Sequence, residues 1–170
     1  LKQAYIRTPN TPAGLGLAFE RTVKRNPYGD ALLFEDQRFS YQELNNWANQ
    51  IAHYFLSIGI QKGDVITVLI ENRPELIATI IALAKIGATA AMVNTSQTGK
   101  VLTHSVNLVK PVAIIVGDEC REAVEEVRRG AVLHQPHGDG LALMGAGEHP
   151  AAADEAAGDT AEGEQTTSHE

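Results

Sequence analysis

The sequence predicts an α/β fold, in which part of a doubly wound parallel sheet carries helices on both faces. The first observation is order: short runs rich in Val and Ile alternate with helical segments between about residues 60 and 130. The second is that runs such as 65–70 have no apolar–polar alternation, as expected of strands covered on both sides. A chain of 170 residues is long enough to bury a core of this kind.

Charge divides the chain into two regions. Residues 1–130 hold all 14 Lys and Arg and 13 acidic residues, so this region is net +1. Residues 131–170 hold 8 acidic and no basic residues, are net −8, and are rich in Ala and Gly with no aromatic residue. We therefore expect a folded part over 1–130 and a disordered acidic tail over 131–170.

Composition excludes several classes of protein. Cys120 stands alone, so the chain cannot form an internal disulfide, and residues 1–14 contain no apolar stretch of the signal-peptide type. The charges form no basic stripe, which argues against nucleic-acid binding. The apolar stretch 76–93 is interrupted by Lys85 and Gly87, so it predicts a helix and a buried strand rather than a membrane span. We expect a cytoplasmic protein without a transmembrane span.

The first elements are predicted from local signals. A helix over 13–24 should bury Leu17, Phe19 and Val23, and a hairpin should follow over 31–39. Ser40 and Glu43 fit a capping box at the start of the next helix, and Gly59 fits its stop. The spacing of apolar residues assigns the inward face of this helix to Leu44, Trp47, Ile51, Tyr54, Phe55 and Ile58.

The remaining elements alternate between strand and helix. Pro74 should open a helix that stops at Gly87, Pro111 should lie just beyond the end of another, and Asp118 should cap a charged helix. No further element is expected after Gly130. The predicted strands are 65–70, 89–93 and 112–116, and the predicted helices are 74–86, 99–109 and 118–129.

The short motifs that suggest chemistry all have a simpler interpretation. Gly14-Leu15-Gly16 lacks the third glycine of a dinucleotide loop, and Thr98-Gly99-Lys100 lacks the outer positions of a phosphate loop. We therefore predict no catalytic, cofactor-binding or metal-binding residue. The glycosylation triplet Asn94-Thr95-Ser96 is interpreted as a chance match, as is the possible metal set of His134, His137 and Asp139. His53 is interpreted as an ordinary helix residue and Cys120 as an inert thiol.

One ordered set of motifs resembles a known family. Over about 31–127 the chain is similar to the N-terminal region of adenylate-forming acyl-CoA synthetases, and Asn94-Thr95 with His104-Ser105 is similar to the long-chain and very-long-chain branch that includes the fatty-acid transport proteins. The motifs that carry this resemblance are Phe39-Ser40-Tyr41-x-Glu43-Leu44, Gly63-Asp64-Val65, Glu71-Asn72-Arg73-Pro74-Glu75, Ala84-Lys85-Ile86-Gly87-Ala88, Asn94-Thr95 and Leu102-x-His104-Ser105.

The resemblance implies an activity for the parent enzyme. Such enzymes use ATP and Mg²⁺ to convert a fatty acid to an acyl-adenylate, from which the acyl group passes to coenzyme A. The family's Ser/Thr/Gly-rich phosphate loop has no match here, so the chain resembles a partial N-terminal AMP-binding-enzyme domain over 1–130, inactive alone and poorly soluble. His104 and Ser105 are expected to serve packing. Peripheral membrane association of the parent enzyme is left open.

Two alternatives remain from the sequence. One is a stand-alone α/β binding or interaction module without catalysis, and the other is a flavodoxin-like or Rossmann-like nucleotide binder. The break near Gly130 suggests a frameshift or truncated gene as the origin of 131–170, which reading the DNA in other frames would test.

Overall fold

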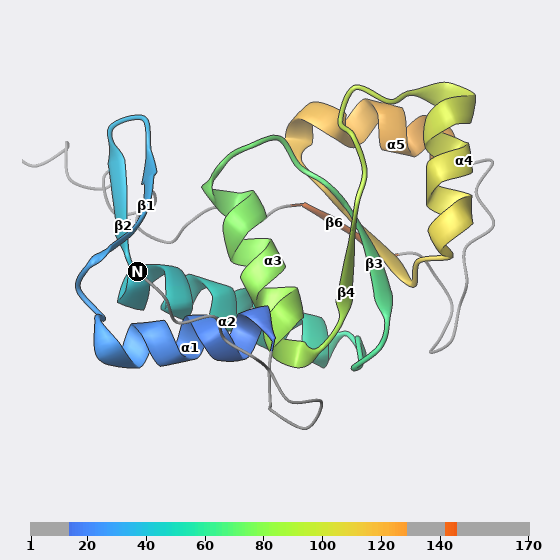
Figure 1. Cartoon of the computed structure of the whole chain (residues 1–170). Helices are drawn as coiled ribbons and strands as arrows, with labels where there is room; N and C mark the ends of the chain where they lie inside the picture. Colours follow the sequence, from blue (N-terminus) through green and yellow to red (C-terminus); the bar gives the residue numbers. More distant parts are fainter. Residues whose placement is uncertain (1–13, 129–141, 146–170) are drawn as a thin grey trace, which may run out of the picture.

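We describe the chain from a computed structural model, which defines residues 14–128 and 142–145 (Figure 1). The elements alternate as expected from the sequence, and each predicted helix and strand between residues 14 and 128 is present. Their bounds are α1 Leu15–Arg25, β1 Asp30–Phe34, β2 Gln37–Ser40, α2 Tyr41–Ser57, β3 Val65–Leu69, α3 Pro74–Ile86, β4 Thr89–Met92, α4 Gly99–Val109, β5 Ala113–Val116, a 3₁₀ turn Asp118–Cys120, α5 Arg121–Arg128 and β6 Ala142–Gly145.

The main sheet is parallel, with the strand order β4-β3-β5-β6. Ile66 of β3 aligns with Ala90 of β4 and with Ala113 of β5. The chain leaves β3 for β4 on one side and then returns to β5 on the other side. The sheet is therefore doubly wound, and the point where the chain changes direction lies between β3 and β5.

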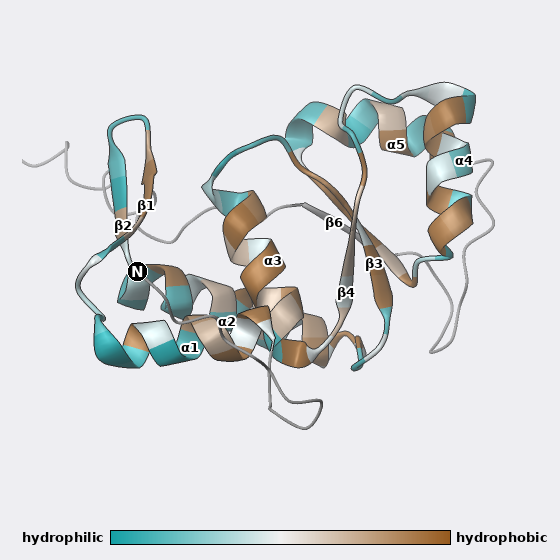
Figure 2. Cartoon of the chain, in the orientation of Figure 1, coloured by the Kyte–Doolittle hydropathy of each residue, from teal (hydrophilic) through white to brown (hydrophobic). Residues whose placement is uncertain are grey.

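Helices cover the two faces of this sheet (Figure 1). The alternating side chains of β3 explain why: Ile66 and Val68 join the core under α2 and α3, whereas Leu69 joins the core under α4 and α5. Figure 2 shows α3 as hydrophobic along most of its length. The α3 helix packs between α1, α2 and the sheet, so it needs an apolar surface on more than one side.

The start of α2 combines two local signals. Ser40 Oγ accepts from the backbone N–H of Glu43 at 3.2 Å, and the Glu43 carboxylate accepts from the Ser40 backbone N–H at 2.8 Å. This is the predicted capping box. Phe39 before it and Leu44 after it are both buried, and the ring of Phe39 stacks on Trp47 with centroids 6.0 Å apart.

The buried face of α2 differs from the predicted one. Leu44, Trp47 and Phe55 are buried as expected, but Tyr54 and Ile58 are 52% and 41% exposed. Ala48 and Ala52 are buried instead. Small side chains let α2 approach its main partner α3 closely, so the contact face follows the alanines rather than the largest apolar residues.

A buried lysine joins three helices. Lys85 Nζ of α3 donates to Asn49 Oδ1 at 2.7 Å and to Asn45 Oδ1 at 2.8 Å, both on α2, and to Glu20 Oε1 of α1 at 3.2 Å. These three acceptors match the three hydrogens of an ammonium group. Nearby, Gly16 of α1 lies so close to α3 that an added Cβ would be 2.9 Å from the Ala84 carbonyl oxygen.

The region after β5 departs from prediction in two places. The expected helix start at Asp118 is instead a 3₁₀ turn with Gly117 at its N-cap, and α5 begins at Arg121. Within the predicted disordered tail, β6 is a strand that pairs in parallel with β5. For these four residues the expectation of no further element is wrong, because the free edge of β5 offers a full row of backbone partners. The rest of 131–170 lies outside the described residues.

None of the helices in the described ranges is long and apolar enough to cross a bilayer.

Candidate functional site

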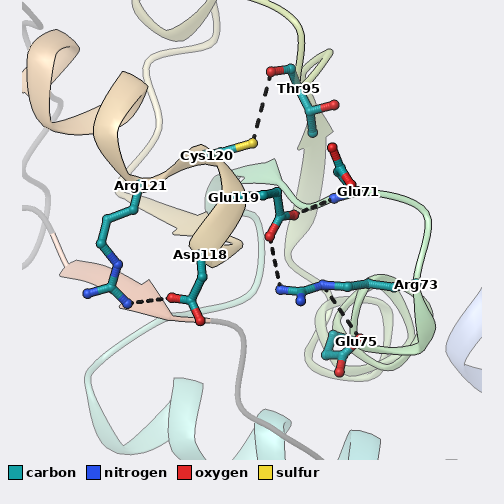
Figure 3. A network of polar contacts seen from close by, with 8 residues as sticks. All are labelled: Glu71, Arg73, Glu75, Thr95, Asp118, Glu119, Cys120 and Arg121. Carbon is teal, nitrogen blue, oxygen red and sulfur yellow. Dashed lines mark hydrogen bonds and ion pairs between the residues drawn. The ribbon is translucent and has the colours of Figure 1, made fainter.

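The candidate site lies at the carboxyl edge of the sheet, where the loops after β3, β4 and β5 meet. In open α/β sheets, ligands bind outside the carboxyl ends of the strands, at the point where the chain changes direction. Here that point lies between β3 and β5, so its loops are those over 70–73 and 117–120. Figure 3 shows the polar side chains that these loops bring together.

Glu119 spans the crevice between the two loops. Its Oε1 accepts from the backbone N–H of Glu71 at 2.8 Å, and its Oε2 lies 3.3 Å from Nη2 of Arg73 (Figure 3). Gly117 allows this arrangement, because an added Cβ at this position would collide with the Glu119 carboxylate. The Gly117 N–H also donates to the Leu69 carbonyl oxygen at 2.7 Å, which fixes the loop against the end of β3.

Arg73 connects this crevice to the start of α3. It is the N-cap residue of α3, and its Nε lies 3.6 Å from Oε2 of Glu75 in the first turn. The side chains of Arg73 and Glu119 are 30% and 24% exposed, so the pair is only partly screened by water. A guanidinium with a carboxylate on each side locks the β3–α3 loop to the β5 loop.

Cys120 lies directly behind this network. It is buried, and its Sγ donates to the Thr95 carbonyl oxygen at 4.0 Å. Burial raises the pKa of the Cys120 thiol, and the nearby carboxylates of Glu119 and Glu71 raise it further, while Arg73 opposes them. A thiol in these surroundings stays protonated at neutral pH and is a poor nucleophile.

A hollow of about 480 Å³ lies beside the network, at the carboxyl ends of β3 and β4. Four of its lining residues are apolar and four are polar, and they come from the ends of β3 and β4, the loops that follow them and the first turn of α3. The lining residues are Ile70, Glu71, Asn72, Leu76, Met92, Val93, Asn94 and Thr95.

The side chains at this edge carry more negative than positive charge. The edge holds four carboxylates and two guanidinium groups. Arg73 pairs with Glu75 and Glu119, and Arg121 pairs with Asp118 at 2.6 Å. The fourth carboxylate is that of Glu71. A triphosphate would be repelled by the excess negative charge. The described residues also contain no group of three or more His, Cys, Asp and Glu side chains placed to hold a metal ion. The network joins the loop after β3 to the loop after β5.

The fold does not bring together the histidines and the short glycine and asparagine motifs singled out in the sequence. His53 is exposed on α2 and His104 is exposed on α4, on opposite sides of the sheet. Gly16 lies inside α1, Gly99 starts α4, and Asn94 Oδ1 accepts from the Ser96 backbone N–H at 2.9 Å in a tight turn. The loose set His134, His137 and Asp139 lies outside the described residues.

The Arg73–Glu119 contact could not be found in the sequence. Arg73 belongs to a family motif and directly precedes a predicted helix start, so the sequence marked it as a candidate structural residue. Glu119 gave no signal, since 48 residues separate it from Glu71, its hydrogen-bond partner. The alternation of strands indicates which loops meet at the sheet edge, but not which side chain enters the crevice.

Fold and site together define a doubly wound α/β region whose carboxyl edge is held by an ion-pair network. The model of the AMP-binding enzyme family matches residues 19–168. The chain therefore belongs to the AMP-binding enzyme family. This match starts before residue 31 and continues past Gly130, so the resemblance is longer than the sequence motifs indicated.

Two of the curated relatives that the chain resembles are named for long-chain fatty acids. The chain is 34% identical over 140 residues to the medium/long-chain-fatty-acid–CoA ligase FadD6 of Mycobacterium tuberculosis, which covers 81% of this chain and 23% of that protein. It is 28% identical over 106 residues to long-chain fatty acid transport protein 6 of Mus musculus, covering 62% and 17%. The chain thus spans less than a quarter of the length of either relative.

Solved structures confirm the fold. The luciferase-like enzyme of the mealworm Zophobas morio superposes with a TM-score of 0.70 at 18% identity, over 82% of this chain and 35% of that one. The α/β fold class is as predicted.

Proposed function

We propose that this chain is the N-terminal part of a fatty acid–CoA ligase and is inactive alone. The observation that carries the proposal is the match to FadD6 over 140 residues, since it includes the motifs of the sheet edge and most of the described elements. Family membership implies ATP use. Fatty acid and coenzyme A are the further substrates proposed for the parent enzyme.

The site supports inactivity of the chain alone. Activation of a carboxylate requires groups that stabilise charge on the transferred adenylate and pyrophosphate. The carboxyl edge described above is acidic, and its two guanidinium groups are engaged by Glu119, Glu75 and Asp118. We infer that the ATP and Mg²⁺ sites are formed by polypeptide of the parent enzyme beyond this edge.

Pyrophosphate exchange tests the proposal directly. The purified chain, with ATP, Mg²⁺ and fatty acids of medium and long chain, should give no fatty-acid-dependent exchange, while FadD6 under the same conditions should. Clear exchange by the chain alone would overturn its inactivity.

The substrate class needs a separate measurement. A chimera in which residues 19–128 replace the matched segment of FadD6 should retain exchange with fatty acids. A folded chimera that exchanges with no fatty acid would contradict the assignment.

If the chain instead unfolds cooperatively as a monomer and binds a specific ligand, the alternative of a stand-alone binding module gains support. Fractionation of the parent enzyme would test the expected cytoplasmic location and would show whether the enzyme associates with membranes.

A further inference from the structure

Strand β4 ends the sheet on one side, and its outer edge is open among the described residues. In β4, the N–H groups of Thr89 and, just beyond the strand, Val93 donate to carbonyl oxygens of Asp64 and Val68, at 2.8 and 3.1 Å. Alternate residues of a parallel strand face opposite neighbours. The N–H and C=O groups of Ala90 and Met92 therefore point outward, away from β3.

Within residues 14–128 and 142–145, this edge lacks the usual protection. Natural edge strands are commonly guarded by charged side chains, by proline or by a covering segment. The residues of β4 are Thr, Ala, Ala and Met, with no charge and no proline. The strand is also half exposed, and Met92 is 51% exposed, whereas all four residues of β5 are buried.

The hollow at the end of β4 extends the same surface. Ala90 packs against the core under α2 and α3, so Met92, two residues on, lies on the same face of the strand. Met92 also lines the hollow with Ile70 and Leu76. An extended segment alongside β4 would place every second side chain above this apolar wall.

We propose that the outer edge of β4 pairs with an extended strand from the remainder of a family-length ligase, whose inward side chains are apolar and fill the hollow beside Met92. This inference rests on the proposed function. FadD6 is more than four times longer than the part of it that the chain matches, so the relatives contain ample polypeptide to provide such a strand. Main-chain hydrogen bonds supply the affinity in this mode of recognition, and side-chain pockets supply specificity.

Hydrogen exchange on the 170-residue chain provides the test. The probe is the FadD6 polypeptide that follows its matched segment, added in trans. On addition, the amides of Ala90 and Met92 should gain at least about tenfold protection. Thr89 and Val93 are internal controls, because their amides are already bonded to β3. No association, or association without protection at Ala90 and Met92, would overturn the inference.

A pair of variants separates edge pairing from general apolar contact. Met92→Lys places a charge on the edge and should weaken the association at least about tenfold. Leu108→Lys alters a side chain that is 72% exposed on α4, on the other face, and should leave the affinity unchanged. Equal effects of the two variants would contradict pairing at β4.

Pyrophosphate exchange by the same mixture distinguishes the two proposals. Fatty-acid-dependent exchange with unprotected β4 amides would refute the strand pairing alone. Protected amides without such exchange would refute the fatty-acid assignment alone.

Discussion

The two faces of the main sheet are built differently. The face under α2 and α3 holds the larger core, with the aromatic side chains of Phe39, Trp47 and Phe55 and the buried lysine at its margin. The face under α4 and α5 holds a smaller aliphatic core with Cys120. It also receives Thr67 of β3, whose hydroxyl is fully buried without a hydrogen-bond partner among the described residues. The difference shows that one sheet can combine a well-satisfied face with an incompletely satisfied one.

The largest effect is expected on the first face. Trp47→Ala removes a side chain that is 3% exposed and stacked on Phe39, so the free energy of unfolding should fall by about 3–5 kcal/mol. Urea unfolding measures it. Tyr54→Ala is the matched control, since this aromatic residue of the same helix is 52% exposed and should cost less than about 1 kcal/mol. Similar losses of unfolding free energy for the two variants would contradict the buried face of α2, which includes Trp47 and leaves Tyr54 exposed.

The second face should respond less strongly. Leu102→Ala empties a fully buried site on α4, and we expect a loss of about 2–4 kcal/mol. Val101→Ala, next to it and 62% exposed, should change stability by less than about 0.5 kcal/mol. A larger loss for Leu102→Ala than for Trp47→Ala would reverse the comparison of the two faces.

The buried lysine gives an intermediate effect. Lys85→Met keeps the length of the side chain but leaves the amide oxygens of Asn45 and Asn49 without their shared donor, at a cost of about 1–3 kcal/mol. Lys100→Met at the exposed start of α4 should be nearly neutral. Thermal unfolding of both variants measures the difference, and a stable Lys85→Met protein would show that the lysine serves no structural purpose.

The smallest effect should be a gain. Thr67→Val replaces a buried hydroxyl by a methyl group of similar size, which removes an unsatisfied polar group and should stabilise the chain by up to about 1 kcal/mol. Thr79→Val tests whether such a swap stabilises at any buried threonine, since Thr79 is 2% exposed on the first face. Destabilisation by Thr67→Val would show that the hydroxyl is satisfied by polypeptide outside the described residues.

Local signals predicted the fold well. The capping box of Ser40, the proline at the start of α3 and the β-branched runs each depend on neighbouring residues, and each is present in the structure. Features that depend on distant partners were missed. Tyr54 was assigned to the core because its spacing is helical, but burial depends on where α3 contacts α2. Glu119 was missed because its partners precede it by almost fifty residues.

Lys85 has a consequence for the way the helices assemble. Its side chain is 8% exposed, and its three acceptors come from two other helices. If α3 packs against only one of α1 and α2, the ammonium group loses part of its water without gaining all its acceptors, which raises the energy of that intermediate. Partly docked states are therefore penalised, and the three helices should form and unfold as one cooperative unit.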